Sequence, residues 1–187
     1  MFHTPAMNMV EMQAEAMGLP ILISETEGEK EKELADLEKA IKEAKEKYGL
    51  TQIVAGALYS KYQYDRVVKI CDSLDLEALA PLWHMSQETL LRELIAESFD
   101  VRITRIASQG LDESFLGKKI DESVVKKFAA INKKMGFHMA GEGGEYESLV
   151  VDCPMFKKRV VIDDSKKVMQ SDITGALEIT KAHLEEK

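Results

Sequence analysis

The sequence contains few of the residues that stabilise small secreted domains or build metal sites. Among 187 residues there are only 2 cysteines, Cys71 and Cys153, and they match no metal-ligand spacing. No apolar run approaches the roughly 20 residues that a membrane-spanning helix requires. The N-terminus has no basic stretch followed by an apolar one, as a secretory signal would have. We therefore expect a reduced, cytoplasmic protein without a membrane anchor.

Positive charge is also scarce. The chain has 25 Lys and Arg against 33 Asp and Glu, which gives a net charge of −8. A broad nucleic-acid surface is not expected, because phosphate binding needs clustered basic side chains. Only 5 of the cations are arginines, so Arg66 is a candidate for binding a phosphate or carboxylate. The apolar fraction of 45% is enough for a core, and the length suits one large or two small domains.

Helical and strand-like segments alternate in the first half of the chain. Apolar residues at helical spacing predict helices over Pro5–Met17 and from Leu34 to Tyr48, each followed by a glycine. The alternation predicts an α/β layer of parallel strands, with Thr51–Ala55 parallel to Leu19–Ser24. The other elements predicted here are a helix over Asp65–Leu74, a strand over Leu79–Trp83 and a helix whose N-cap is Ser86.

The second half has a different pattern, richer in strands. Asp121 is predicted to cap a helix that Gly136 ends. The predicted strands are Val101–Ala107, Glu147–Asp152, Arg159–Asp163 and Leu177–Leu184, with a turn at Asp163-Asp164-Ser165. We place a domain boundary between Glu97 and Asp100, which gives domains at 1–97 and 98–187. The second is expected to be a smaller α+β domain.

The segment from Gly56 to Ser60 follows a predicted strand, and in parallel sheets ligands bind at the carboxyl ends of strands. Gly56 lets the backbone approach a ligand closely, and the start of the next helix favours anions. Polar groups are offered by Ser60, Tyr62, Gln63 and Arg66. The alternative is an ordinary loop in which Arg66 pairs with an acid such as Asp65 or Glu88.

The run GFHMAGEGGEYESLVVDCPMF, residues 136–156, gathers glycines and carboxylates around Tyr146. Its carboxylates could orient a cationic substrate, hold Mg²⁺ together with nucleotide phosphates, or accept a proton from an attacking amine. The alternative is a surface hairpin with solvated acids. Cys71 and His138 are interpreted as structural residues, and Trp83 as part core and part pocket wall.

Several runs together resemble the diphthine–ammonia ligase family of ATP pyrophosphatases. They are GALYSKYQYDRV (56–67), APLW (80–83), QGLD (109–112), LGK (116–118) and GEGGEYESLVVDCP (141–154). The resemblance implies a Rossmann-like parallel layer of the adenine nucleotide alpha hydrolase type, with ATP and Mg²⁺ as cofactors. It also implies the last step of diphthamide synthesis on elongation factor 2. In that step the diphthine carboxylate is activated as an adenylate, pyrophosphate leaves, and ammonia displaces AMP to form the amide.

The resemblance also implies roles for particular residues. The nucleotide-binding set is Gly56, Ser60, Gln63 and Arg66. The substrate-binding set is Tyr62, Trp83, Glu142, Gly143, Gly144 and Tyr146. Glu145 and Glu147 are the catalytic candidates, and no metal ligand is assigned.

One feature of the family does not occur in the 187 residues. Family members begin with a strand and a Ser-Gly-Gly-Lys-Asp-Ser loop that holds the pyrophosphate of ATP, and no such run is found here. We interpret this as truncation, and we expect these residues alone to bind ATP weakly and not to turn it over. A sheet without that strand has exposed edges, so a homo-oligomer is possible. Two alternatives stay open: a non-catalytic binding subunit or degenerate paralogue, and a related ATP pyrophosphatase that acts on a small molecule or RNA.

Overall fold

The chain divides into two compact units. The structure, a computed structural model, describes residues 7–26 and 32–187. Of these, the first unit holds the described part of 21–85, and the second, which has more residues, holds 7–20 and 86–187. The predicted boundary at 97/98 lies one helix further along the chain than this division. No helix in the described ranges is long and apolar enough to cross a membrane.

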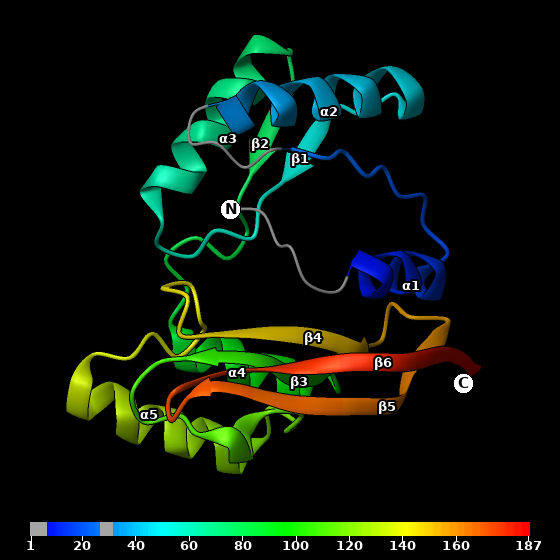
Figure 1. Ribbon diagram of the computed structural model, residues 1–187. Coiled ribbons are helices and arrows are strands. Elements are labelled where there is room, and N and C mark those ends of the chain that lie inside the picture. The colour runs from blue at the N-terminus through cyan, green and yellow to red at the C-terminus, as the bar shows by residue number, and fades with distance from the viewer. Residues whose placement is uncertain (1–6, 27–31) are drawn as a thin grey trace. The chain divides into compact units, whose positions relative to one another are not determined.

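The first unit is built around a strand–helix–strand arrangement. Strand β1 (Gln52–Val54) runs parallel to β2 (Glu77–Leu79), and helix α3 (Lys61–Ser73) connects them, while α2 (Lys32–Tyr48) precedes β1 (Figure 1). The predicted parallel layer is therefore confirmed. Cys71 of α3 is 1% exposed, which agrees with its interpretation as a core residue. Burial, with the adjacent charge of Asp72, raises the pKa of its thiol.

Two strand predictions in this region were wrong. Leu19–Ser24 has no regular secondary structure, so the predicted pairing of this segment with Thr51–Ala55 is not formed. The apolar side chains of Leu19 and Ile23 are 52% and 41% exposed, and Pro20 has no N–H to donate to a ladder. Leu79–Trp83 was also misplaced, because β2 ends at Leu79 and a turn follows.

The second unit is an antiparallel sheet with helices on both faces. Its strands are β3 (Asp100–Ala107), β4 (Tyr146–Asp152), β5 (Lys158–Ser171) and β6 (Thr174–Glu186), in the order β4-β3-β6-β5. Its helices are α1 (Met7–Met17), α4 (Gln87–Ala96) and α5 (Glu122–Met135), with a short 3₁₀ turn η1 (Glu113–Phe115). Figure 1 shows the long β5–β6 hairpin beside β3.

Alternation along β4 assigns the two faces of this sheet. Tyr146 packs into the core formed with α4 and α5, whereas Leu149 and Val151 pack into a second core that includes residues of α1. Gln13 of α1 donates from its amide to the Val150 carbonyl at 2.8 Å. Phe128 of α5 is fully buried at the centre of the first core. The carboxylate-rich loop that precedes β4 is thus anchored by a strand packed on both sides.

Helix ends in the second unit follow the predicted capping residues. The side chains of Ser86 and Asp121 accept hydrogen bonds from the backbone N–H groups of Thr89 and Val124. Gly136 ends α5 in the left-handed conformation, with φ of +72°. These local predictions are confirmed.

The predicted turn at Asp163-Asp164-Ser165 was wrong. These residues lie inside β5, which continues to Ser171 and pairs with β6 along its length, and the turn comes at 172–173. The pairing register shifts between Ile162 and Asp164 and again between Asp164 and Ser165, so the polar run marks an irregularity in the strand. Asp163 and Asp164 are exposed. Their polarity reflects solvent on that face of the strand.

Candidate functional site

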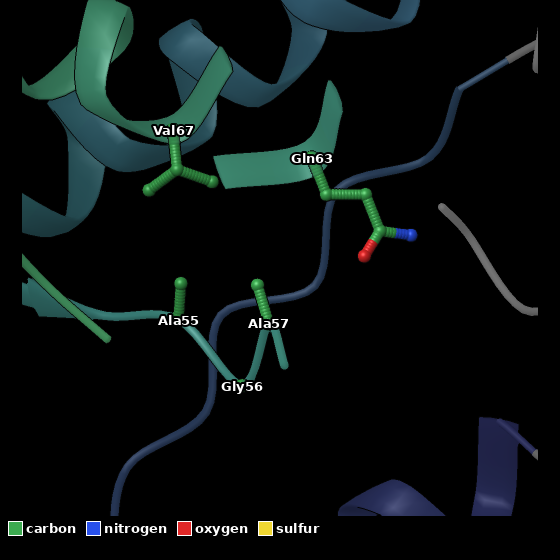
Figure 2. A pocket seen from close by; sticks show the side chains of 5 residues that line it. All are labelled: Ala55, Gly56, Ala57, Gln63 and Val67. Atoms are coloured by element: carbon green, nitrogen blue, oxygen red, sulfur yellow. The ribbon is translucent and has the colours of Figure 1, made fainter. Parts of the chain in front are cut away.

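An apolar pocket opens at the carboxyl end of β1. Its volume is about 190 Å³, and its lining residues are Ala55, Gly56, Ala57, Gln63 and Val67. Figure 2 shows Val67 of α3 pointing toward the methyl groups of Ala55 and Ala57, while the amide of Gln63 lies to one side. The structure therefore brings together two of the predicted nucleotide residues, Gly56 and Gln63. Sequence reasoning missed the alanines and Val67, because small apolar residues carry no functional signal of their own.

Gly56 is not required by the surrounding protein. Its backbone is not in the left-handed region, and a Cβ built on it would meet no atom within 4 Å. An alanine at this position would therefore cost the fold nothing through strain or collision. Gly56 lines the pocket, and the space beside it is open.

The two other predicted nucleotide residues have partners within α3. The Ser60 hydroxyl caps α3 by accepting from the Gln63 backbone N–H at 3.4 Å. The Arg66 guanidinium lies over the Tyr62 ring, 3.2 Å from its centroid, and its Nη1 donates to the Tyr62 carbonyl at 3.2 Å. Asp65 does not take Arg66 as an ion-pair partner but pairs with Lys61.

A ladder of stacked rings follows β2. Tyr64 stacks on Trp83 with ring centroids 4.8 Å apart, Trp83 on His84 at 4.8 Å, and His84 on Tyr59 at 5.4 Å. His84 has a φ of +60°, an uncommon conformation for a residue with a side chain. Its backbone N–H donates to the Leu58 carbonyl at 2.8 Å.

This aromatic ladder fastens the loop after β2 to the loop after β1. The Tyr59 hydroxyl also donates to the His84 carbonyl, at 3.3 Å. Strained residues of this kind cluster at functional sites, where neighbouring contacts hold them in place. Trp83 is half-buried and stacks between Tyr64 and His84, so it supports the loop that follows β2. Sequence reasoning missed the role of His84, since nothing in APLWH signals a left-handed backbone.

Residues 136–145 connect α5 to β4 in the second unit, and we call them the glycine–glutamate loop. This loop is internally hydrogen-bonded. One oxygen of Glu145 accepts from the His138 backbone N–H at 3.0 Å, and His138 Nδ1 accepts from the Glu142 backbone N–H at 3.2 Å. His138 Nε2 then faces a Glu142 carboxylate oxygen at 3.7 Å. Nδ1 carries no hydrogen, because it accepts this hydrogen bond. The three residues form one connected cluster.

Tyr146 and Gln87 anchor this loop to the core. The Tyr146 ring packs on Phe128 and Phe137, and its hydroxyl donates to the Met139 carbonyl at 2.8 Å. Burial, and then the charge of Glu145, raise the pKa of the Tyr146 phenol far above its ordinary value. The Met139 N–H donates to the Gln87 side-chain oxygen at 2.7 Å. Tyr146 therefore holds the loop from inside.

Two glycines shape the loop for different reasons. Gly141 has a φ of +73°, and a Cβ there would lie 2.9 Å from the Tyr146 carbonyl oxygen. Gly143 lies directly against the Glu145 carboxyl group, whose nearest oxygen would be 2.6 Å from an added Cβ. A side chain at 143 would therefore displace the Glu145 carboxylate. The second oxygen of Glu145 is buried, and no described residue forms a hydrogen bond with it.

Glu147 lies in β4 and belongs to a different charge pair. Its carboxylate is 3.3 Å from Nη1 of Arg105 on the neighbouring strand β3. Of the predicted acidic residues, Glu142 and Glu145 are thus brought together around His138, while Glu147 is neutralised across the sheet. No group of at least three His, Cys, Asp or Glu side chains suited to a metal ion occurs in residues 7–26 and 32–187.

Comparison with known proteins assigns the chain to a family. Residues 1–78 match the diphthamide synthase N-terminal domain, and residues 86–184 match its C-terminal domain. The chain is 38% identical to the diphthine–ammonia ligase of Mus musculus, with the alignment covering 100% of this chain and 76% of that protein. The corresponding identity to the Homo sapiens ligase is 36%, with the same coverage.

A more distant relative is the diphthine–ammonia ligase of Schizosaccharomyces pombe, 33% identical over 91% of this chain and 30% of that protein. The class of fold, a parallel α/β unit followed by a unit with an antiparallel sheet, fits these two domains. The chain belongs to the diphthine–ammonia ligase family.

Proposed function

We propose that this protein is an ATP-dependent ligase that joins ammonia to the carboxylate of diphthine on elongation factor 2. The observation that carries this proposal is the match along the whole chain to diphthine–ammonia ligases, at 38% identity to the Mus musculus protein. ATP supplies the activation: the carboxylate becomes an adenylate with release of pyrophosphate, and ammonia then displaces AMP to give the amide.

The described residues of the first unit fit the base end of a nucleotide. The pocket beside Gly56 is apolar, lies at the end of a parallel strand, and carries one amide, that of Gln63. The start of α3 is already capped by Ser60, and among the described residues no lysine lines this pocket. These residues would therefore hold the nucleoside part of ATP. Mg²⁺ would accompany the phosphates, since it binds mainly through phosphate oxygens and water and needs few protein carboxylates.

The glycine–glutamate loop supplies the chemistry expected on the substrate side. Diphthine carries a trimethylammonium group, and the carboxylates of Glu142 and Glu145 would balance its charge. The Glu145 carboxylate, one oxygen of which is held by the His138 backbone N–H, would accept the proton that ammonia loses as the amide forms. We assign this role to Glu145 and not to Glu147, because Arg105 already neutralises Glu147. Tyr146 and Gly143 position the Glu145 carboxylate.

Substitution of Glu145 by glutamine tests this assignment. Glu145→Gln keeps the size and the acceptor for the His138 N–H but removes the charge and the proton acceptor. We expect amide formation by the enzyme to fall about 100-fold or more, the ordinary contribution of one general base, with little change in melting temperature. Glu147→Gln is the matched control, and it should retain most of the activity.

The outcome that would contradict the assignment is a loss of stability with turnover of the folded enzyme unchanged. Glu145 would then be a structural residue of the loop, and the proton acceptor would have to be sought elsewhere.

A further inference from the structure

All four polar groups of His138 contact residues of the glycine–glutamate loop. Its backbone N–H donates to the Glu145 carboxylate at 3.0 Å, and its carbonyl accepts from the Gly141 N–H at 2.9 Å. Its Nδ1 accepts from the Glu142 N–H at 3.2 Å, and its Nε2 lies 3.7 Å from a Glu142 carboxylate oxygen. Backbone atoms make the first two contacts, so almost any residue at position 138 would supply them. Only the contacts to Glu142 require the imidazole.

Glu142 is a residue that needs such support. It lies between two glycines, Gly141 and Gly143, and glycine loses more conformational freedom on folding than any other residue. The chain around Glu142 is therefore held by its contacts and not by its own preference. The imidazole and the Glu142 side chain are only 18% and 14% exposed, so water would replace the contact between them poorly. The His138 ring thus restrains both the backbone and the carboxylate of Glu142.

We propose that His138 is a positioning residue whose imidazole holds the Glu142 carboxylate in place for the cationic group of the substrate. This inference rests on the proposed function and divides the loop between two tasks. Glu145, the proton acceptor, is held by a backbone N–H, whereas Glu142 is held by the ring. Substitutions that remove the ring should therefore weaken substrate binding and leave the chemical step unchanged.

Asparagine and glutamine distinguish the two nitrogens of the His138 ring. In asparagine the amide oxygen is bonded to Cγ, as Nδ1 is in histidine, so it can accept the Glu142 N–H. Glutamine is one carbon longer, and its amide reaches the place of Nε2 instead. Both side chains are neutral and polar. His138→Asn should therefore keep Glu142 in position, whereas His138→Gln and His138→Leu should release it.

The test is steady-state kinetics of the enzyme with diphthine-bearing elongation factor 2 as the varied substrate, at saturating ATP and ammonia. We expect His138→Gln and His138→Leu to raise KM for this substrate about threefold to tenfold, the effect of one lost hydrogen bond. The kcat should stay within about twofold, and His138→Asn should restore KM. His183→Leu is the matched control and should change neither constant, since His183 Nδ1 faces Asp163 at 2.9 Å on the β5–β6 hairpin.

A double-mutant cycle completes the test, because a positioning residue acts only through the residue that it positions. In a Glu142→Ala background, His138→Leu should not raise KM further. An equal rise with and without Glu142 would overturn the inference, and so would a His138→Asn enzyme with the KM of His138→Leu. A lower melting temperature with KM unchanged would leave His138 with a structural role alone. Each of these results leaves the proposed function standing, whereas absence of amide formation by the unsubstituted enzyme would refute that function and this inference with it.

Discussion

Substituting Gly143 by alanine tests how the glycine–glutamate loop holds its carboxylate. Gly143 does not have a left-handed backbone, so the change introduces no backbone strain. The three atoms nearest to the added Cβ all belong to the Glu145 carboxyl group, at 2.6–2.9 Å. These distances are too short, so the carboxylate must move away from the His138 N–H, which it now meets at 3.0 Å.

The expected cost follows from the lost contact. A hydrogen bond to a charged group contributes about 1.5–3 kcal/mol to the free energy of unfolding. A Gly→Ala substitution restricts the unfolded chain, which stabilises the folded state by about 0.4–1 kcal/mol. Because Glu145 is partly exposed, we take the lower part of the range for the hydrogen bond. We therefore expect Gly143→Ala to lower the free energy of unfolding by about 1 kcal/mol.

Without the Glu145 carboxylate, we expect the effect of Gly143→Ala on the free energy of unfolding to change sign. When Glu145 is first replaced by alanine, no carboxylate remains to collide with the new methyl group. Gly143→Ala should then stabilise the unit by about 0.4–1 kcal/mol. Gly144→Ala is the control: its φ is +84° with no atom within 4 Å of an added Cβ, so it should cost about 1–2 kcal/mol in either background.

Amide hydrogen exchange of α5 measures the unfolding free energy of the second unit, and exchange of the His138 amide reports the local contact. The double-mutant cycle isolates the coupling between positions 143 and 145. If Gly143→Ala costs the same with and without Glu145, the contact inferred here does not exist in solution.

Three further predictions concern other parts of the chain. Gly56→Ala should leave the free energy of unfolding unchanged or raise it by up to about 1 kcal/mol. The same substitution should weaken AMP binding, measured by calorimetry. A lower free energy of unfolding would show that Gly56 has a structural role. Hydrogen bonds from Ser123 and then from the Val124 N–H lower the pKa of Asp121, so its contribution to stability should be complete above about pH 4 and be lost as the pH falls through the lowered folded pKa. Asp121→Asn should keep the cap without that pH dependence in acid denaturation, whereas Asp121→Ala should cost about 1 kcal/mol at neutral pH. His84→Gly should be about 1 kcal/mol more stable than His84→Ala, because only glycine adopts the left-handed backbone without strain. Urea unfolding followed by Trp83 fluorescence measures this difference. Equal stability of the two variants would show that the backbone at position 84 is not strained.

The parts of the fold that were predicted correctly depend on local signals. Ser86, Asp121 and Gly136 act on backbone groups within four residues of themselves, so their effects can be read from neighbouring letters. The segment Leu19–Ser24 has the composition of a buried strand, but a strand exists only where another backbone pairs with it, and no pairing is seen there. The same limit explains the misplaced turn at Asp163, where pairing with β6 overrides polar composition.

The site shows a similar division. The run 136–156 was predicted as a site because it is rich in glycines and carboxylates. Gly56 and Gln63 were predicted because they follow a strand. The contact between Gly143 and Glu145 and the ring of His84 between Trp83 and Tyr59 depend on three-dimensional placement. Glu145 and Glu147 look equivalent in sequence, and only their partners, the His138 backbone and Arg105, distinguish them.

Deleting the gene of this protein tests whether the protein forms the amide of diphthamide. Elongation factor 2 purified from the deletion strain is digested, and the peptide with the modified histidine is analysed by mass spectrometry. We expect the peptide to carry the free carboxylate of diphthine. The intact gene should restore the amide, whereas a Glu145→Gln allele should restore little of it. A peptide that carries the amide in full after deletion would contradict the claim.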